Sequence, residues 1–481
     1  MKHTRKSDIF VIGFALFSMF FGAGNVIFPP YLGLESGAQW VLGFICYYIA
    51  DIGLALVALF AILHRGGSEG ITRRIGRIPS TLLMCAIVLC IGPMLAIPRT
   101  AASTYEMSIC PLVAGFSPVL FSALFFALIL LLCIRQSAVV DIVGKILTPG
   151  LLIGLLILIV MGIVNPIGPI STTTLVENVP QTGIEAGYQT MDVLAAMVFG
   201  IIILKSARDK GHTEPADQAR IVAGAGVVAG IALMVVYMGL TYLGATTAHF
   251  FDLTVNRTYL VTAIVRNLMG QGGTVLFAIV VALACITTAV ALVSSAADFF
   301  STLSGGKVSY RVLVVVFCVF SAVVSNFGLD QIISIASPIL DIVYPPTLVL
   351  ILLAFFSNRI RNDWVYRLAT LGALLFSVLS VLKNTFGAPL GFLDYLPLSS
   401  LGFGWLLPSL VLGAIGFLLP GGGVTVHLGR ADDGKPVEQA PQHRHMLRQG
   451  AAAAPYHGRA GPQQIRHVLR KLEGGQRAAV R

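Results

Sequence analysis

Residues 151–163 read LLIGLLILIVMGI, a run without a charged, amide or hydroxyl side chain. Apolar and polar residues do not alternate in it, as they do in the strands of a membrane β-barrel. Of the 481 residues of the chain, 56% are hydrophobic and 11% are charged, whereas soluble domains carry about 25% charged residues. Since only helices and closed barrels satisfy the backbone polar groups inside lipid, the sequence predicts an all-α integral membrane protein.

Apolar runs of this kind recur throughout residues 1–419, and roughly 20 such residues span a bilayer core as a helix. About 12 transmembrane helices are predicted, at 8–33, 39–63, 79–109, 117–134, 141–164, 187–204, 218–246, 273–302, 308–325, 330–356, 364–383 and 399–419. Before the tail, 18 Lys and Arg residues lie on the side of the N-terminus, against Arg257, Arg266 and Lys383 on the other side. Because cytoplasmic loops are enriched in Lys and Arg, we expect a multi-pass protein with a cytoplasmic N-terminus.

The segment 420–481 differs in composition from the predicted transmembrane domain, 1–419. It holds ten Lys and Arg, four Asp and Glu, and an AAAA run. Such a segment buries too little apolar area to fold alone, so we predict a basic, disordered cytoplasmic tail without a functional site. The alternatives are an arm that attracts anionic lipid or nucleic acid and translation of a shifted reading frame.

The first predicted span is interrupted by small residues. Residues 17–30 read FSMFFGAGNVIFPP, with Gly22-Ala23-Gly24-Asn25 near the middle of the apolar segment. If the helix unwinds here, the N–H groups that begin its second half can bind a carboxylate. Carbonyls that end its first half, together with the amide oxygen of Asn25, can coordinate a hard cation such as Na⁺. The alternative is a patch of small residues for helix packing.

Polar residues in two other spans are further candidates, because such residues inside a membrane tend to mark function. Asp192 lies near the start of the sixth span, either in the interior or at the outer interface. Thr287 and Thr288 lie in the eighth span. Their hydroxyls either ligate Na⁺ or bond back to helix carbonyls, as membrane Ser and Thr commonly do.

Charged residues of the third and later spans are less easily interpreted. Arg99 and Glu106 lie two turns apart and either pair with each other or belong to an extracellular gate. Lys145 is either a snorkelling lysine or an amine that replaces a bound Na⁺. Asp341 lies in a second proline-broken span, and the sequence does not place two further acids, Asp51 and Asp298.

The chain offers no predicted soluble domain in which an enzyme site could be built. The longest predicted external loop, 165–186, has 22 residues, and no H-E-x-x-H, G-x-S-x-G or Walker-type sequence occurs. We therefore expect a transporter rather than an enzyme, with no cofactor and no nucleic-acid partner.

Three long segments resemble the bacterial branched-chain amino acid:cation symporters, the LIVCS or BrnQ-like family. They are FALFSMFFGAGNVIFPP (14–30), GPMLAIPRT (92–100) and GYQTMDVLAAMVFG (187–200), and residues 287–300 are similar as well. The resemblance covers about 1–419, and the tail does not resemble the ending of the family. It implies the amino acid–polyamine–cation superfamily and its LeuT-type fold, with two inverted five-helix repeats and two extra helices. The site would lie at mid-membrane between broken first and sixth spans.

The resemblance also implies roles for individual residues. The backbone of Gly22, Ala23 and Gly24 would hold the substrate carboxylate beside Asn25. Met191, Asp192 and Leu194 would complete the substrate site, with Phe199 in its apolar part. The implied Na⁺ ligands are Ser18, Phe20, Phe21, Asn25, Asp192, Thr287 and Thr288.

The expected function is uptake of leucine, isoleucine and valine across the bacterial inner membrane, by symport with Na⁺ or H⁺. The ion would be a coupling ion, and the lipid bilayer a further partner. The alternatives are a proton-coupled carrier using Lys145 or Asp192, an exchanger of other small neutral amino acids, an ion channel and a membrane-embedded enzyme.

Overall fold

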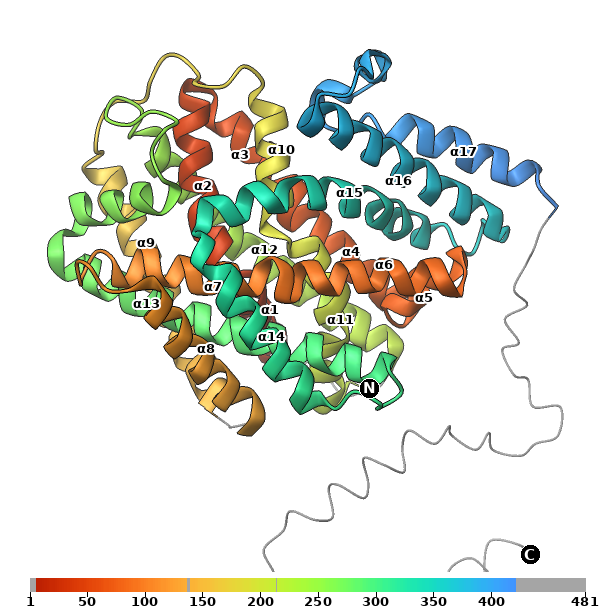
Figure 1. The fold of residues 1–481 in the computed structure, drawn as a ribbon, viewed down its shortest axis with the longest axis horizontal. Helices are drawn as coiled ribbons and strands as arrows, with labels where there is room; N and C mark the ends of the chain where they lie inside the picture. The colour runs from red at the N-terminus through yellow and green to blue at the C-terminus, as the bar shows by residue number, and fades with distance from the viewer. Residues whose placement is uncertain (1–5, 136–138, 213, 421–481) are drawn as a thin grey trace, which may run out of the picture. The chain divides into compact units, whose positions relative to one another are not determined.

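The computed structural model describes residues 6–135, 139–212 and 214–420, and these are helical without a single β-strand among them (Figure 1). The predicted tail, apart from Pro420, lies outside the described residues. The α-helices are α1 (Lys6–Phe20), α2 (Ala23–Ser36), α3 (Trp40–Tyr48), α4 (Leu54–Arg65), α5 (Ser68–Thr72), α6 (Arg77–Leu89), α7 (Ala96–Thr104), α8 (Pro118–Arg135), α9 (Val139–Val164), α10 (Val179–Thr190), α11 (Asp192–Asp209), α12 (Pro215–Ala245), α13 (Arg257–Leu303), α14 (Tyr310–Val324), α15 (Leu329–Phe355), α16 (Asp363–Phe386) and α17 (Leu406–Leu418).

Most of these helices are long and apolar enough to cross a membrane, alone or in pairs. Within the described residues, seven stretches meet both conditions: Gly24–Arg65, Arg77–Ile109, Ala216–Ala245, Arg257–Leu303, Tyr310–Phe327, Leu329–Phe355 and Asp363–Phe386. Four shorter apolar helices are Ser7–Phe20, Pro118–Ile134, Leu152–Val164 and Leu406–Leu418. The first predicted span corresponds to Ser7–Phe20 with the start of Gly24–Arg65, the second to the rest of Gly24–Arg65, and the sixth to α10 followed by α11. Each of the other nine predicted spans corresponds to one of these stretches.

Three predicted boundaries differ from the structure. The sixth span begins at Val179 rather than 187, because Asn178 caps α10 by accepting a hydrogen bond from the N–H of Gln181. The predicted external loop 165–186 therefore contains most of α10. The eighth span extends back to Arg257, capped by Asn256 and kinked at Gly270. The last span begins at Leu406 rather than 399.

Close helix packing holds both halves of the first span against α12. α12 packs along both α1 and α2, and α10 packs against α3. A Cβ on Gly33 of α2 would lie 1.9 Å from the carbonyl oxygen of Thr241, and one on Gly244 of α12 would lie 1.8 Å from that of Pro30. Only glycine permits this contact between the backbones of α2 and α12.

Several membrane helices are interrupted near their middle. α1 and α2 are separated at Phe21–Gly22, and α10 and α11 at Met191. The second span contains a π-helical turn at Ile49–Gly53, and the third span contains another at Cys90–Met94 with Pro93 inside it. Such turns free backbone groups or re-aim side chains inside a helix, and the spans that carry them form the site.

Candidate substrate and ion site

The break in the first span is shorter than the sequence suggested. α1 ends at Phe20, Gly22 is extended with φ −107° and ψ −178°, and α2 begins at Ala23. Ala23, Gly24 and Asn25 therefore form the first turn of α2 rather than an unwound segment. The first N–H groups of a helix have no carbonyl partner within the helix, and the helix dipole makes this end favourable for an anion. The predicted carboxylate-binding backbone thus lies at a helix N-terminus.

The sixth span breaks at Met191, which has a left-handed backbone with φ 67°. Asp192 follows as the first residue of α11 and is 5% exposed, so it lies in the protein interior rather than at the outer interface. The amide nitrogen of Asn25 donates to Oδ2 of Asp192 at 2.8 Å and to the hydroxyl of Tyr237 on α12. This amide connects the two broken helices directly.

Arg99 of α7 caps the half-helix on the other side of the break. Its Nη1 donates to the carbonyl oxygen of Gln189 at 2.6 Å, and its Nη2 lies 3.5 Å from that of Thr190. These carbonyls belong to the end of α10, where the helix dipole is negative. The guanidinium also lies over the ring of Phe28, 5.5 Å from its centroid. Arg99 is 5% exposed and is a component of the interior site.

Asp51, in the π-helical turn of the second span, is an additional member that sequence reasoning did not place. Its Oδ1 accepts a hydrogen bond from the hydroxyl of Thr190 at 2.7 Å, it is fully buried, and its carboxylate interacts with that of Asp192. The sequence did contain a signal for it, an acidic residue inside an apolar span, because a charged side chain is costly there and tends to mark a functional site. With both acids ionised, Asp51, Asp192 and Arg99 together carry a charge of −1.

A cavity of about 50 Å³ lies at the junction of these elements. Predicted site residues on its wall are Phe20, Gly22, Gly24, Asn25, Arg99, Met191, Asp192, Phe199 and Thr288. Apolar residues from α1, the third span and α13 complete the wall, among them Met19, Ile91 and Leu292. Polar groups thus gather at the helix breaks, and apolar side chains face them.

Other predicted site residues do not line this cavity. The hydroxyl of Thr287 donates to the carbonyl oxygen of Ala284 at 2.9 Å, which is the backbone-bonded alternative. The ring of Phe21 stacks on those of Phe17 and Tyr237. Ser18 lies in α1, and the side chain of Leu194 is fully buried in the core. The side chain of Lys145 lies outside the described part of the chain.

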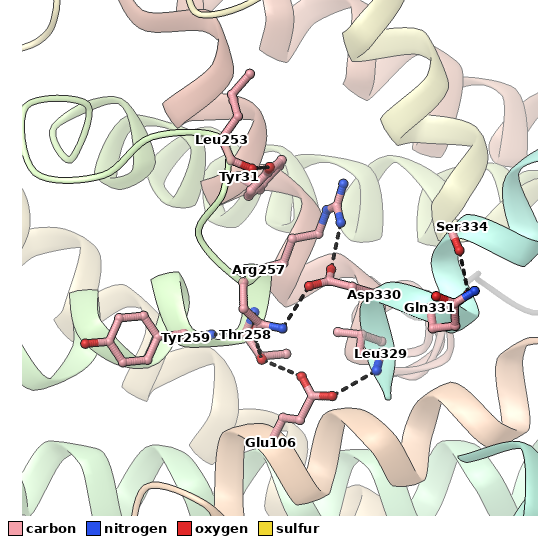
Figure 2. Close-up of polar contacts among 11 residues, drawn as sticks. Tyr31, Glu106, Leu253, Arg257, Thr258, Tyr259, Leu329, Asp330, Gln331 and Ser334 are labelled. Carbon is pink, nitrogen blue, oxygen red and sulfur yellow. Dashed lines mark hydrogen bonds and ion pairs between the residues drawn. The ribbon is translucent and has the colours of Figure 1, made fainter. Parts of the chain in front are cut away.

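Glu106 belongs to a separate cluster and does not pair with Arg99 (Figure 2). One carboxylate oxygen accepts from the hydroxyl of Thr258 at 2.6 Å, and the other accepts from the N–H of Leu329 at 2.8 Å. Beside it, Arg257 forms an ion pair with Asp330 at 2.7 Å. The guanidinium of Arg257 lies over the ring of Tyr31, 4.4 Å from its centroid. The cluster joins α2, the end of the third span, and the starts of α13 and α15.

The family model for the branched-chain amino acid transport protein matches residues 5–421. The branched-chain amino acid permease BraB of Bacillus subtilis is 36% identical over 433 residues, which cover 87% of this chain and 97% of the permease. The permease BrnQ of Escherichia coli K12 is 37% identical over 422 residues, which cover 86% of this chain and 95% of that permease. The branched-chain amino acid transport system 2 carrier protein of Pseudomonas aeruginosa is 37% identical over 428 residues, which cover 86% of this chain and 97% of that carrier.

Solved structures with the same fold include inward-facing Mhp1, with a TM-score of 0.56 and 13% identity over 85% of this chain and 90% of that one. MhsT in complex with L-phenylalanine has a TM-score of 0.55 and 15% identity, over 86% of this chain and 98% of that one. These likenesses concern the fold alone and confirm the predicted LeuT-type architecture. The relatives are permeases and carriers, so the protein is a membrane transporter and not an enzyme. The chain belongs to the branched-chain amino acid transport protein family.

Proposed function

We propose that the protein imports leucine, isoleucine and valine by symport with a monovalent cation, Na⁺ in the first instance. The observation that carries the proposal is the meeting of three helix ends, those of α2, α10 and α11, with Asn25, Arg99 and Asp192 in one buried cavity. The names of the related permeases and carriers support the substrate class.

The charges of the site suit a zwitterion. The N–H groups of the first turn of α2, at Ala23 and Gly24, would bind the substrate carboxylate beside the guanidinium of Arg99. The carboxylate of Asp192 would bind the ammonium group. Both ends of an amino acid backbone are thereby compensated inside the membrane, where an unpaired charge is costly.

The charge of the site also supports cotransport of a cation. With both acids ionised, Asp51, Asp192 and Arg99 sum to −1, and a zwitterion adds no net charge. One monovalent cation neutralises the loaded site, so substrate and cation favour each other's binding. Asn25, Asp192 and Thr288 bring oxygen atoms to the same cavity, which suits Na⁺, with the predicted carbonyls of Ser18, Phe20 and Phe21 as further ligands. The alternative is a proton, which the facing acids Asp51 and Asp192 would share.

The cavity, at about 50 Å³, is smaller than a leucine and must widen to admit one; its apolar wall residues, among them Met19, Phe20 and Phe199, would then contact a branched aliphatic side chain. A difference of one methylene changes binding in such a pocket by only about 1–3 kcal/mol. We therefore expect the three branched substrates to compete with one another rather than a single one to be selected.

The membrane orientation is part of the proposal. The Lys and Arg distribution supports a cytoplasmic N-terminus, and the bacterial source of the related permeases supports the inner membrane. Reporter fusions after Phe355, between the tenth and eleventh spans, and after Thr385, beyond the eleventh, should report the cytoplasm and the exterior respectively. The reversed pattern would overturn the orientation.

Uptake of radiolabelled leucine into proteoliposomes tests the function. Under an inward Na⁺ gradient we expect accumulation that unlabelled isoleucine and valine abolish and that choline cannot support. Equal accumulation in choline with an inward proton gradient would identify H⁺ as the coupling ion. Uptake only into vesicles preloaded with another neutral amino acid would identify an exchanger. Absence of any gradient-dependent or exchange uptake would refute carrier-mediated symport.

A further inference from the structure

The orientation of the Asn25 side chain is fixed by two partners on different helices. Its amide nitrogen donates to Oδ2 of Asp192 at 2.8 Å and to the hydroxyl oxygen of Tyr237, on α12, at 2.5 Å. An ionised carboxylate only accepts hydrogen bonds, so the end of the amide that faces Asp192 must be the NH₂ group. The Tyr237 oxygen meets the same NH₂ group and therefore accepts as well, which engages both amide protons.

The amide oxygen of Asn25 lies on the other side of the side chain, at the break in the first span. A Cβ built on Gly22 would have this oxygen, Oδ1, as its nearest neighbour, at 3.9 Å. Gly22 and Asn25 both line the central cavity. Among the described residues, no group donates a hydrogen bond to Oδ1. The oxygen is therefore available to a cation bound at the break.

Tyr237 is packed in the core beside the same break. Its side chain is fully buried. Its ring stacks on that of Phe21, with 6.1 Å between the centroids, and meets the ring of Tyr47 edge to face at 5.8 Å. Tyr237 thus contacts the chain on both sides of Gly22, at Phe21 through its ring and at Asn25 through its hydroxyl. Both of these residues are predicted to ligate the cation.

We propose that Tyr237 is a positioning residue for the coupling cation, whose hydroxyl keeps the amide oxygen of Asn25 turned toward the ion. This inference rests on the proposed symport with Na⁺. Tyr237 is not among the residues that line the cavity, so it acts through Asn25 rather than by binding the ion. Without the second acceptor the amide can rotate, because the last torsion of Asn is broad. A rotated amide turns its NH₂ group, which carries partial positive charge, toward Na⁺.

Tyr237→Phe tests the proposal, because it removes the hydroxyl and keeps the ring that packs against Phe21 and Tyr47. One hydrogen bond changes an equilibrium by about three- to tenfold. We expect the Na⁺ concentration for half-maximal leucine uptake to rise by that factor. At saturating Na⁺ the bound ion itself holds the amide oxygen, so the KM for leucine and the maximal rate should return to the wild-type values. A general structural defect would instead lower the maximal rate or raise KM at every Na⁺ concentration.

Tyr48→Phe is the matched control. The Tyr48 hydroxyl also bonds to α12, donating to the carbonyl oxygen of Gly230 at 2.9 Å, but it takes no part in the contact with Asn25. This variant should keep the wild-type response to Na⁺. An equal shift in both variants would assign the effect to the packing of α12 in general, and a wild-type response in Tyr237→Phe would overturn the role of its hydroxyl.

A measurement without leucine separates this proposal from the proposed function. Ligand binding stabilises a folded protein, so Na⁺ added to the purified full chain, with choline keeping the ionic strength constant, should raise its melting temperature. Tyr237→Phe should need about three- to tenfold more Na⁺ for the same rise. An equal response of wild type and variant refutes the role of Tyr237 alone. A wild type that responds to Na⁺ neither here nor in uptake refutes the Na⁺ site, and the role of Tyr237 with it.

Discussion

The guanidinium of Arg99 lies directly against Gly24, so that a Cβ placed on Gly24 would stand 2.4 Å from Nη2 of Arg99. Arg99 thus fixes the distance between the first turn of α2 and the end of α10. Its guanidinium fits there only because residue 24 is a glycine. The absence of a side chain at residue 24, rather than backbone flexibility, is what the site requires there.

Gly24→Ala should impair transport by displacing Arg99 from the carbonyls of α10. Forcing an extra methyl group into a packed interior costs about 1–3 kcal/mol, and about 1.4 kcal/mol corresponds to a tenfold change. We expect leucine uptake to fall roughly tenfold. Gly154→Ala in α9 is the control, because nothing lies within 4 Å of its added Cβ. Equal uptake by the two variants would contradict this account of Gly24.

Arg99→Lys should retain the positive charge but lose part of the cap on α10. A lysine ammonium cannot reproduce the planar pair of donors that faces Gln189 and Thr190. Charge-assisted hydrogen bonds contribute about 1.5–3 kcal/mol each, so roughly a tenfold or greater weakening of leucine binding is expected. Arg73→Lys, at the exposed start of a 3₁₀ turn at the predicted cytoplasmic end, is the matched control for isothermal binding measurements. Wild-type affinity in Arg99→Lys would exclude a role for the guanidinium geometry.

Asn25→Ala should abolish the stimulation of uptake by the cation. The substitution removes the donor to Asp192 and Tyr237 and an amide oxygen of the cavity wall. Initial uptake rates measured against Na⁺ concentration should become flat, while Asn165→Ala, in an exposed loop, keeps the wild-type curve. A normal Na⁺ dependence in Asn25→Ala would remove Asn25 from the ion site.

Asp51→Asn changes the charge of the site from −1 to 0 when both acids are ionised. The neutral site no longer needs a cation to hold a zwitterion, so the coupling between leucine and cation binding should fall. In the wild type, leucine affinity measured with and without Na⁺ should differ at least about fivefold, which is the lower end of typical coupling between two ligands. In Asp51→Asn the two affinities should hardly differ. Retention of the full ratio would show that Asp51 takes no part in coupling.

Glu106→Gln should loosen the cluster at the predicted outer end. It removes the charge that accepts hydrogen bonds from Thr258 and the N–H of Leu329, and a buried donor left without its acceptor costs about 1–3 kcal/mol. We expect a lower melting temperature than in Glu177→Gln, an exposed loop control. If Glu106 also gates the site, Thr288→Cys in a chain without its native cysteines should react faster with an impermeant thiol reagent when Glu106→Gln is added. Unchanged labelling would leave Glu106 a purely structural role.

The sequence alone determined the features that depend on local composition. Apolar runs as long as a bilayer gave every span, and the glycines at 22 and 24 located the first break to within a few residues. The motif segments around Asn25, Arg99 and Asp192 identified the family. Boundaries were wrong at α10 and at the start of α13, because these segments are polar enough to resemble loops, while capping residues 178 and 256 start helices there.

Only the tertiary structure decided which polar side chains meet. Arg99 and Glu106 are seven residues apart in sequence, yet one caps α10 and the other holds the start of α15. Asn25 and Asp192 are 167 residues apart and share a hydrogen bond. Helical periodicity sets the face on which a side chain lies, but its partner depends on how distant helices pack and where they break. The meeting of Asp51, Asp192 and Arg99, on which the proposed coupling to a cation rests, follows from that packing.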